Sequence, residues 1–350
     1  MLVIVPDLPP NINGLGDYAY LLANQLKKDD VSLKIDFLIA GNYKYPFDEY
    51  DGFKVYNLLD KKASVLYSLL QQIDPILIHL HYVGYGYAKR GAPFWLYFGI
   101  LKWKQKKGNI LITTFHELFA NSILPLTSSF WNQWFQKLIC KKIYLISKCV
   151  ITSSESFREV LFKFSPFIDI YVYPVFSNFG ELKKCPKIEL RDKGLIVLGS
   201  KENRLNLYKK YHKELNIICR TFSIVRIYDV GPKFGKLPLL NVPVIELGVL
   251  KANQISNLLT KNSFGIISRH SSEQFAKSGI YAAFTAHGNI VIALQANSSK
   301  IKDGIIADKH FITMNSQNIN LDLISKSAFA WYNNHSLEKQ AISYSNLFKF

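Results

Sequence analysis

The segment FAKSGIYAAFTAHG, at residues 275–288, combines residue types that can bind a phosphate group. Ser278 can cap a helix that starts at Gly279, and the first backbone N–H groups of such a helix carry a partial positive charge. Lys277 adds a full positive charge beside them, and Gly279 lets a ligand approach the backbone. The segment predicts a diphosphate site, although an ordinary capped helix that ends at Gly288 would use the same residues.

A second group of basic residues follows the apolar run LIVLG, which ends at Gly199. Lys201 and Arg204 come soon after this run, and α/β proteins bind ligands at the carboxyl ends of their parallel strands. Two cations there could complement the negative charge that grows when a nucleoside diphosphate leaves. Lys209 and Lys210, further along the expected helix, are explained equally well by a solvated basic face.

A glycine-rich turn, NGLGDYA, lies between the first apolar run and the first expected helix. Gly14, Gly16 and a following alanine fit a permissive GxGxxA fingerprint, which would indicate a nicotinamide or flavin site. Residues 6–12 argue against that site, because the true fingerprint follows its strand immediately. Two other interpretations stay open: a plain glycine turn with Asp17 as the helix N-cap, or a loop that lines a cleft and contacts a sugar or phosphate.

The segment HYVGYGYAKR alternates tyrosines with glycines and ends in two cations. A permissive aromatic loop of this kind could stack against a saccharide or a lipid-linked acceptor, and a merely packed loop explains it nearly as well. The candidate acceptor-side residues are Tyr85, Tyr87, Lys89 and Arg90.

Three histidines occur within or directly after expected strands. His79 and His81 would point to one face of a strand, but a zinc site needs a third ligand and none is nearby, so we expect no metal site. His116 ends the run ILITTFH, which places a titratable group at the carboxyl edge of a parallel sheet, where active sites form. We therefore treat His116 as a catalytic candidate, with a satisfied interior histidine as the alternative.

These candidates need a scaffold that gathers strand ends, and alternating strands and helices predict one. Strands are expected near residues 2–6, 33–39, 53–58, 76–80, 110–115, 148–152 and 169–173, and helices near 16–28, 63–73, 93–106, 129–145 and 155–162. A second series has strands from Gly194 and near 223–228, 243–247, 264–268 and 290–294, and helices near 202–217, 251–260, 279–287, 318–333 and 336–348.

The pattern predicts an α/β protein with two Rossmann-like, doubly wound domains that face each other across a cleft. Residues 174–192 contain prolines and a charge cluster without periodicity, so we place the linker there. The expected boundaries are an acceptor-side domain at 1–180, a linker at 181–192, a donor domain at 193–333 and a last helix at 334–350 that could cross back to the first domain.

The composition of the 350 residues excludes a disordered chain, because 49% are hydrophobic and 14% aromatic. A net charge of +17 predicts an anionic partner: a nucleic acid, an acidic membrane surface or a phosphorylated substrate. Four cysteines without a metal-binding spacing indicate reduced thiols and a cytoplasmic protein. The N-terminus resembles a first strand and not a signal peptide, and the longest apolar run is about half of the ~20 residues that span a bilayer.

Taken together and in order, these segments resemble the two-domain GT-B glycosyltransferases, and in particular bacterial proteins related to glycosyltransferase family 4. NGLGDYAYLLANQL, HYVGYGYAKRGAPFWL, TTFHELFA, TSSE, PVFSNFGE and FAKSGIYAAFTAHGNIVI carry the resemblance over nearly the whole chain. It implies that Lys201 and Arg204 contact the donor phosphates, that Ser278 and Gly279 present a helix N-terminus to them, and that Gly16 and His116 border the transferred sugar. It also implies retention of anomeric configuration, with no divalent metal and no cofactor beyond the nucleotide-sugar donor.

The expected function is transfer of a hexose from a nucleoside-diphosphate sugar to a lipid-linked or saccharide acceptor, in surface polysaccharide or glycolipid synthesis. One departure keeps a non-catalytic binding or regulatory protein open, because the family's paired glutamates (the EX7E pattern) fall on Ala276 and Ala283. A nucleic-acid-binding protein is a remote alternative, since no nucleic-acid-binding motif accompanies the dispersed lysines. Residues 93–107 and 130–144 combine aromatics with lysines, which would suit peripheral binding to an anionic membrane or an ordinary core face with solvated lysines.

Overall fold

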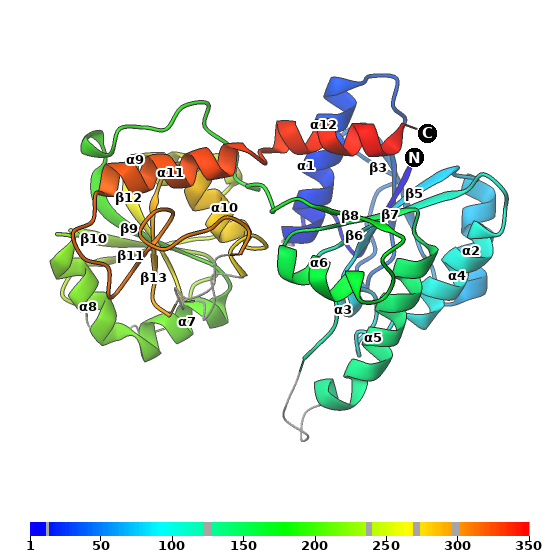
Figure 1. Ribbon diagram of the computed structural model, residues 1–350, viewed down its shortest axis with the longest axis horizontal. Helices are drawn as coiled ribbons and strands as arrows, with labels where there is room; N and C mark the ends of the chain where they lie inside the picture. The colour runs from blue at the N-terminus through cyan, green and yellow to red at the C-terminus, as the bar shows by residue number, and fades with distance from the viewer. Residues whose placement is uncertain (12–13, 122–127, 236–239, 269–273, 296–301, 350) are drawn as a thin grey trace. The chain divides into compact units, whose positions relative to one another are not determined.

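The computed structural model describes residues 1–11, 14–121, 128–235, 240–268, 274–295 and 302–349 (Figure 1). The chain forms two compact units. The first consists of Met1–Tyr173 together with Leu337–Phe350, and the second of Pro174–Ser336.

The first unit is built on an eight-stranded sheet with the order β3-β4-β2-β1-β5-β6-β7-β8. Its strands are β1 (Leu2–Val5), β2 (Asp36–Ile39), β3 (Glu49–Tyr50), β4 (Phe53–Asn57), β5 (Leu77–Tyr82), β6 (Ile110–Phe115), β7 (Cys149–Thr152) and β8 (Asp169–Val172). All neighbouring strands are parallel except β3 and β4. β1 is buried along its whole length, which explains its uninterrupted apolar sequence.

The helices of the first unit are α1 (Gly14–Asp29), α2 (Ala63–Ile73), α3 (Gly84–Tyr87), α4 (Phe94–Lys104), α5 (Ser128–Ile146), α6 (Glu155–Phe162) and α12 (Leu337–Phe348). The core includes side chains from strands β1, β5 and β6 and from helices α2, α4 and α5. Helix α12 packs against α1 although more than 300 residues separate them, and Tyr18 of α1 donates a hydrogen bond to Gln340 of α12 at 2.9 Å. The chain thus returns to its first unit at residue 337.

The second unit has a parallel sheet in the order β11-β10-β9-β12-β13-β14. The strands are β9 (Asp192–Leu198), β10 (Arg226–Val230), β11 (Val244–Gly248), β12 (Asn262–Ile267), β13 (Ile290–Ala293) and β14 (Ile312–Thr313). The helices are α7 (Lys201–Lys210), α8 (His212–Thr221), α9 (Ala252–Lys261), α10 (Gly279–Ala286) and α11 (Leu321–Asn333), with a 3-10 turn at Ile188–Leu190. This is the strand order of the Rossmann fold: successive strands are added on one side from β9 to β11 and on the other side from β12 onward, so the strand order reverses between β9 and β12.

Two expectations differ from the structure in this unit. The helix expected at residues 202–217 is two helices, because the chain breaks at Tyr211, whose ring is buried in the core. The segment 181–192, expected as a linker, belongs to the second unit. It is bound through Leu182, whose N–H donates to Ala286 O at 3.3 Å, and through Arg191, which donates to Gly288 O at 3.1 Å.

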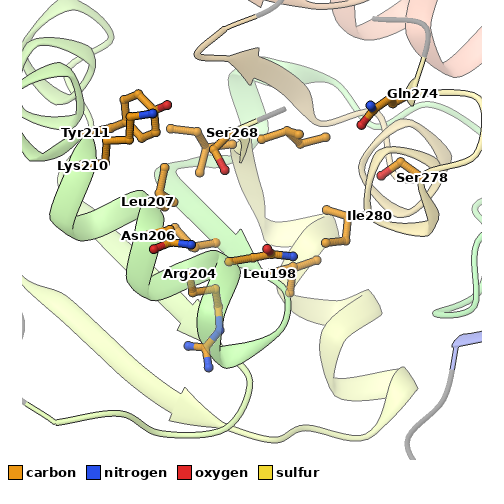
Figure 2. Close-up of a pocket in the computed structure, with 14 residues that line it drawn as sticks. Leu198, Arg204, Asn206, Leu207, Lys210, Tyr211, Ser268, Gln274, Ser278 and Ile280 are labelled. Atoms are coloured by element: carbon orange, nitrogen blue, oxygen red, sulfur yellow. The ribbon is translucent and has the colours of Figure 1, made fainter. Parts of the chain in front are cut away.

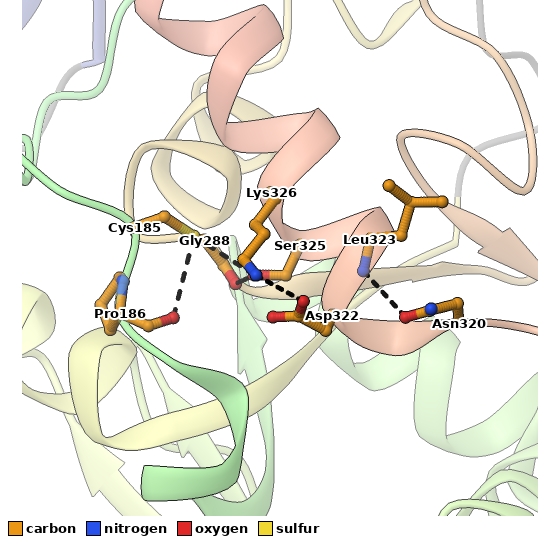
Figure 3. A network of polar contacts seen from close by, with 8 residues as sticks. All are labelled: Cys185, Pro186, Gly288, Asn320, Asp322, Leu323, Ser325 and Lys326. Carbon is orange, nitrogen blue, oxygen red and sulfur yellow. Dashed lines mark hydrogen bonds and ion pairs between the residues drawn. The ribbon is translucent and has the colours of Figure 1, made fainter.

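Figure 3 shows part of the same attachment, where Cys185 Sγ lies 3.5 Å from Ser325 Oγ of α11. Ser325 Oγ donates in turn to Gly288 O at 2.6 Å. A segment without periodicity can therefore be well packed, since its polar groups find partners one at a time. The boundary was predicted near residue 180 because the sequence pattern shows periodicity and does not show packing. In the structure the first unit ends at Tyr173.

Candidate functional site

A pocket of about 530 Å³ lies at the carboxyl ends of β9 and β12 in the second unit. These two strands flank the point at which the strand order of the sheet reverses, where doubly wound proteins bind their ligands. Figure 2 shows side chains of α7 on one side of the pocket and the start of α10 on the other. The lining residues are Val197, Leu198, Asn203, Arg204, Asn206, Leu207, Lys210, Tyr211, Ile266, Ile267, Ser268, Gln274, Ser278 and Ile280.

The N-terminus of α10 lies at this pocket, with Ser278 as its cap. The Ser278 hydroxyl accepts a hydrogen bond from the Tyr281 N–H at 3.3 Å. Gly279 is exposed, and a Cβ added there would have no atom within 4 Å. The first N–H groups of a helix have no intrahelical acceptor, so this end of α10 can bind an anion.

The N-terminus of α7 lies close to the same point. Ser200 caps α7 by accepting a hydrogen bond from the Asn203 N–H at 3.3 Å. Gly199, directly before it, has a φ of +144°, and a Cβ there would lie 3.5 Å from Ile280 Cδ1 of α10. Two positively polarised helix ends therefore lie beside Gly199. Its positive φ explains why a glycine follows β9 at this point.

Arg204, which we predicted to contact the donor phosphates, lines the pocket but has partners within the fold. Its side chain is 1% exposed and forms an ion pair with Asp229, and it also donates to Gly199 O at 2.9 Å and to Pro232 O. The guanidinium further lies 4.6 Å from the centre of the Phe234 ring. The charge of Arg204 is thus paired with that of Asp229 inside the fold, and the contact of Arg204 with a phosphate stays a prediction.

The other basic candidates near the pocket have different positions. Lys201 is exposed at the first position of α7 and does not line the pocket. Lys277 is partly buried directly before the α10 cap. Lys210, which we assigned equally to a solvated face, lines the pocket and lies 5.3 Å from the centre of the Tyr211 ring.

Most of the polar lining was missed by the sequence analysis. Asn203, Asn206 and Lys210 lie on one face of α7, and Ser268 and Gln274 complete the polar side chains that sequence motifs did not indicate. The i, i+3, i+7 spacing on α7 was the available signal, because such residues share a helix face. Among the described lining residues none is Asp or Glu, so the pocket is chemically suited to an anion.

The glycine turn of the first unit forms the start of α1, which begins at Gly14. A Cβ on Gly16 would lie 2.7 Å from Asp7 O, so the close packing of α1 on the loop after β1 requires a glycine there. Asp17 lies within the first turn and not at the N-cap, which corrects that interpretation. Burial, assisted by the neighbouring charge of Asp7, raises the pKa of Asp17 to about 6.

His116 lies at the carboxyl end of β6, as expected. Its Nε2 is 2.9 Å from His81 Nδ1, and the edge of the Tyr18 ring packs against it with the ring centres 5.1 Å apart. Burial lowers the pKa of His116 to about 4, so the ring is neutral at pH 7. His116 remains partly exposed, whereas His81 is fully buried on β5.

The neighbouring histidine is also engaged within the fold. His79 Nε2 lies 2.8 Å from Thr114 Oγ1, which lies 3.2 Å from the Tyr344 hydroxyl of α12. The described part of the chain contains no group of three or more His, Cys, Asp or Glu side chains placed to hold a metal ion.

The four acceptor-side candidates separate into two kinds. Tyr87 is fully buried, and its hydroxyl donates to His81 O at 2.7 Å, so the prediction of an exposed stacking ring is wrong for this residue. Tyr85 is 51% exposed and its hydroxyl accepts from Gln136 at 2.9 Å. Lys89 and Arg90 are exposed.

Helix α5 has two apolar faces. One packs into the core through Ile139, Cys140, Ile143 and Tyr144. The other is exposed, and we call it the α5 surface; it consists of Trp131, Trp134, Phe135, Leu138 and Leu145. Lysines accompany it, and the sequence from Ser128 to Lys148 contains no acidic residue. No helix in the described ranges is long and apolar enough to span a membrane.

The two doubly wound units define the class of protein, and comparison with solved structures identifies it as the GT-B glycosyltransferase fold. The chain is similar to sucrose-phosphate synthase from Thermosynechococcus elongatus (12% identity, 99% of this chain and 98% of the other, TM-score 0.66). It is also similar to the E. coli trehalose-6-phosphate protein bound to UDP-2-fluoro glucose (10% identity, 100% and 99%, TM-score 0.62).

A third structure with this fold is a Listeria monocytogenes protein assigned as a UDP-N-acetylglucosamine 2-epimerase (13% identity, 97% of this chain and 89% of the other, TM-score 0.53). No family model and no curated protein matches the sequence. The predicted fold class is confirmed, and the reaction has to be argued from the site.

Proposed function

We propose that this protein is a glycosyltransferase that takes a hexose from a nucleoside-diphosphate sugar. The observation that carries the proposal is the 530 Å³ pocket at the point where the strand order of the second sheet reverses. Two helix N-termini lie beside this pocket, and its described lining residues include no acidic side chain. A nucleoside diphosphate has the size and charge that suit such a pocket. The structure with UDP-2-fluoro glucose shows that a protein of this fold can bind a UDP-sugar.

The catalytic contribution of the second unit would be stabilisation of the leaving group. Negative charge on the diphosphate grows as its bond to the sugar breaks, and preorganised N–H donors stabilise developing charge strongly because they need no reorganisation. The N–H groups at the start of α10 supply such donors, and Lys210 adds a cation on the opposite wall. We also propose that the reaction retains the anomeric configuration and needs no metal, because the sequence resemblance implies both.

The proposed acceptor is argued from a surface of the first unit. The α5 surface is aromatic and basic, which is the composition of elements that bind anionic membrane interfaces. Phe94 of α4 extends it, with the Phe94 and Phe135 ring centres 6.1 Å apart. We therefore propose that the enzyme binds an anionic membrane surface and acts on a lipid-linked acceptor in glycolipid or surface polysaccharide synthesis. The cytoplasmic side belongs to the proposal because the cysteine pattern indicates reduced thiols.

A non-catalytic binding protein is the second candidate, and one observation favours it. The alanines at the positions of the family's paired glutamates, Ala276 and Ala283, are both buried in the core of the second unit. Side chains buried in this way make no polar contact with a sugar. A protein of this kind would bind the donor without turnover.

The experiment is a calorimetric titration of the full chain with UDP-, GDP-, ADP- and dTDP-sugars, followed by product analysis with membrane lipid extract as acceptor. The proposal expects micromolar to millimolar binding of one donor and an acceptor-dependent release of its nucleoside diphosphate. Binding without release would support the non-catalytic candidate. Conversion of the donor to its C2 epimer would instead assign the activity of the Listeria protein, and no binding of any donor would refute both candidates.

A further inference from the structure

The hydrogen bond between His81 and His116 joins a buried imidazole to a partly exposed one. His81 Nδ1 and His116 Nε2 are 2.9 Å apart, and the planes of the two rings differ by 19°. A neutral imidazole has one N–H donor and one acceptor nitrogen. One ring must therefore donate and the other accept. If His116 accepts at Nε2, its Nδ1 carries a proton; if His116 donates from Nε2, its Nδ1 is an acceptor.

The surroundings of His81 determine the choice. His81 is 1% exposed, and its Nε2 has no hydrogen-bonding partner among the described residues. The space that His81 borders together with Ala19 and Leu22 of α1 has no room for a water molecule. A buried N–H without an acceptor is rarer than a buried acceptor without a donor, so the proton of His81 belongs on Nδ1.

The proton position of His116 follows. If His81 Nδ1 donates, His116 accepts at Nε2 and carries its own proton at Nδ1. The ring is held in place by the edge-on Tyr18 ring, and the His116 backbone N–H donates to Tyr82 O at 3.0 Å. Of the two histidines, His116 alone retains some exposure.

We propose that His81 is a positioning residue that fixes His116 as the Nδ1–H tautomer, so that His116 donates a hydrogen bond to a substrate oxygen and does not act as a general base. That the acceptor of this hydrogen bond is a substrate oxygen rests on the proposed function; the tautomer does not. The low pKa of His116 is consistent with this role, because the ring stays neutral at pH 7.

The test is the long-range 1H–15N spectrum of the full, 15N-labelled chain at pH 7 without ligand, with His116 assigned by comparison with His116→Gln. We expect the His116 Nδ1 shift of a protonated nitrogen and the Nε2 shift of an unprotonated one. His81→Phe should move the signal toward the Nε2–H form that imidazole favours in water. His81→Asn should restore the native pattern, because its amide N–H can replace the Nδ1–H donor.

His79→Phe is the matched control, since His79 is equally buried on the same strand but bonds to Thr114. It should leave the His116 tautomer unchanged. A native His116 protonated at Nε2, or an unchanged tautomer in folded His81→Phe, would overturn the inference. If His81→Phe fails to fold, the native spectrum alone decides. The native tautomer as expected, together with no binding of any nucleotide sugar, would refute the proposed function and leave the histidine assignment standing.

Discussion

Arg204 and Asp229 form an ion pair in which each side chain is 1% exposed. Removing one member of such a pair leaves a buried charge without a partner, which typically costs about 3–5 kcal/mol. We therefore expect Arg204→Met to lower the free energy of unfolding of the second unit by about that amount, measured by urea denaturation. The double variant Arg204→Met/Asp229→Leu should be less destabilised than the single one, and an equal or larger loss would contradict the ion-pair explanation.

Gly279 allows donor binding to be separated from folding. A side chain there meets no neighbouring atom, and a carboxylate in the first turn of a helix is favourable for the helix itself. Gly279→Glu should therefore fold normally but bind a nucleoside-diphosphate sugar at least about tenfold more weakly, or ~1.4 kcal/mol, because the carboxylate repels the diphosphate. Gly279→Ala is the size control, and calorimetry should find it close to the native affinity. Equal binding by both variants would remove α10 from the donor site.

The α5 surface predicts binding to anionic vesicles. Trp131 and Trp134 are 68% and 71% exposed, so Trp131→Ser/Trp134→Ser should change the stability of the first unit by less than about 1 kcal/mol. Flotation with vesicles that contain phosphatidylglycerol should fall several-fold in this variant. Phe167→Ser is the control, since Phe167 is 92% exposed but lies outside the α5 surface. Flotation that is equal with and without anionic lipid would exclude the electrostatic part of the proposal.

His79 predicts a loss of stability in acid. Burial lowers its pKa from 6.5 to about 3, so the folded state favours the neutral ring. The stabilisation is complete above the unfolded pKa of 6.5 and is lost as the pH falls from there toward 3. His79→Gln, which can keep the bond to Thr114, should lose less in thermal midpoint between pH 7 and pH 5 than the native chain. An identical loss in both proteins would show that His79 does not contribute.

Asp17 predicts the opposite dependence on pH. Its pKa is raised from 3.8 to about 6 by burial, so the fold favours the protonated carboxyl, and this contribution is lost as the pH rises through 6. Asp17→Asn should raise the thermal midpoint of the first unit at pH 7.5 and have little effect at pH 4. Equal effects at the two values would show that ionisation of Asp17 is not linked to folding.

Much of the fold could be predicted because buried parallel strands are uninterrupted apolar runs, as in β1 and β13. The place of Ser278 and Gly199 also followed from sequence, since capping residues and strand ends have local signals. The burial of Arg204 on α7 had no such signal, because its partner Asp229 lies 25 residues away on strand β10. Tyr87 was misjudged for a similar reason, since the acceptors of its hydroxyl, Ile4 O and His81 O, are brought to it by the sheet.

The return of α12 to the first unit has a consequence for biosynthesis. The ribosome delivers residues 1–173 before the second unit, but Gln340 and Tyr344, which contact Tyr18 of α1, emerge only after it. The first unit therefore keeps one side of α1 exposed until α12 has been synthesised. The second unit, which ends at Ser336, has all of its residues before the first unit does.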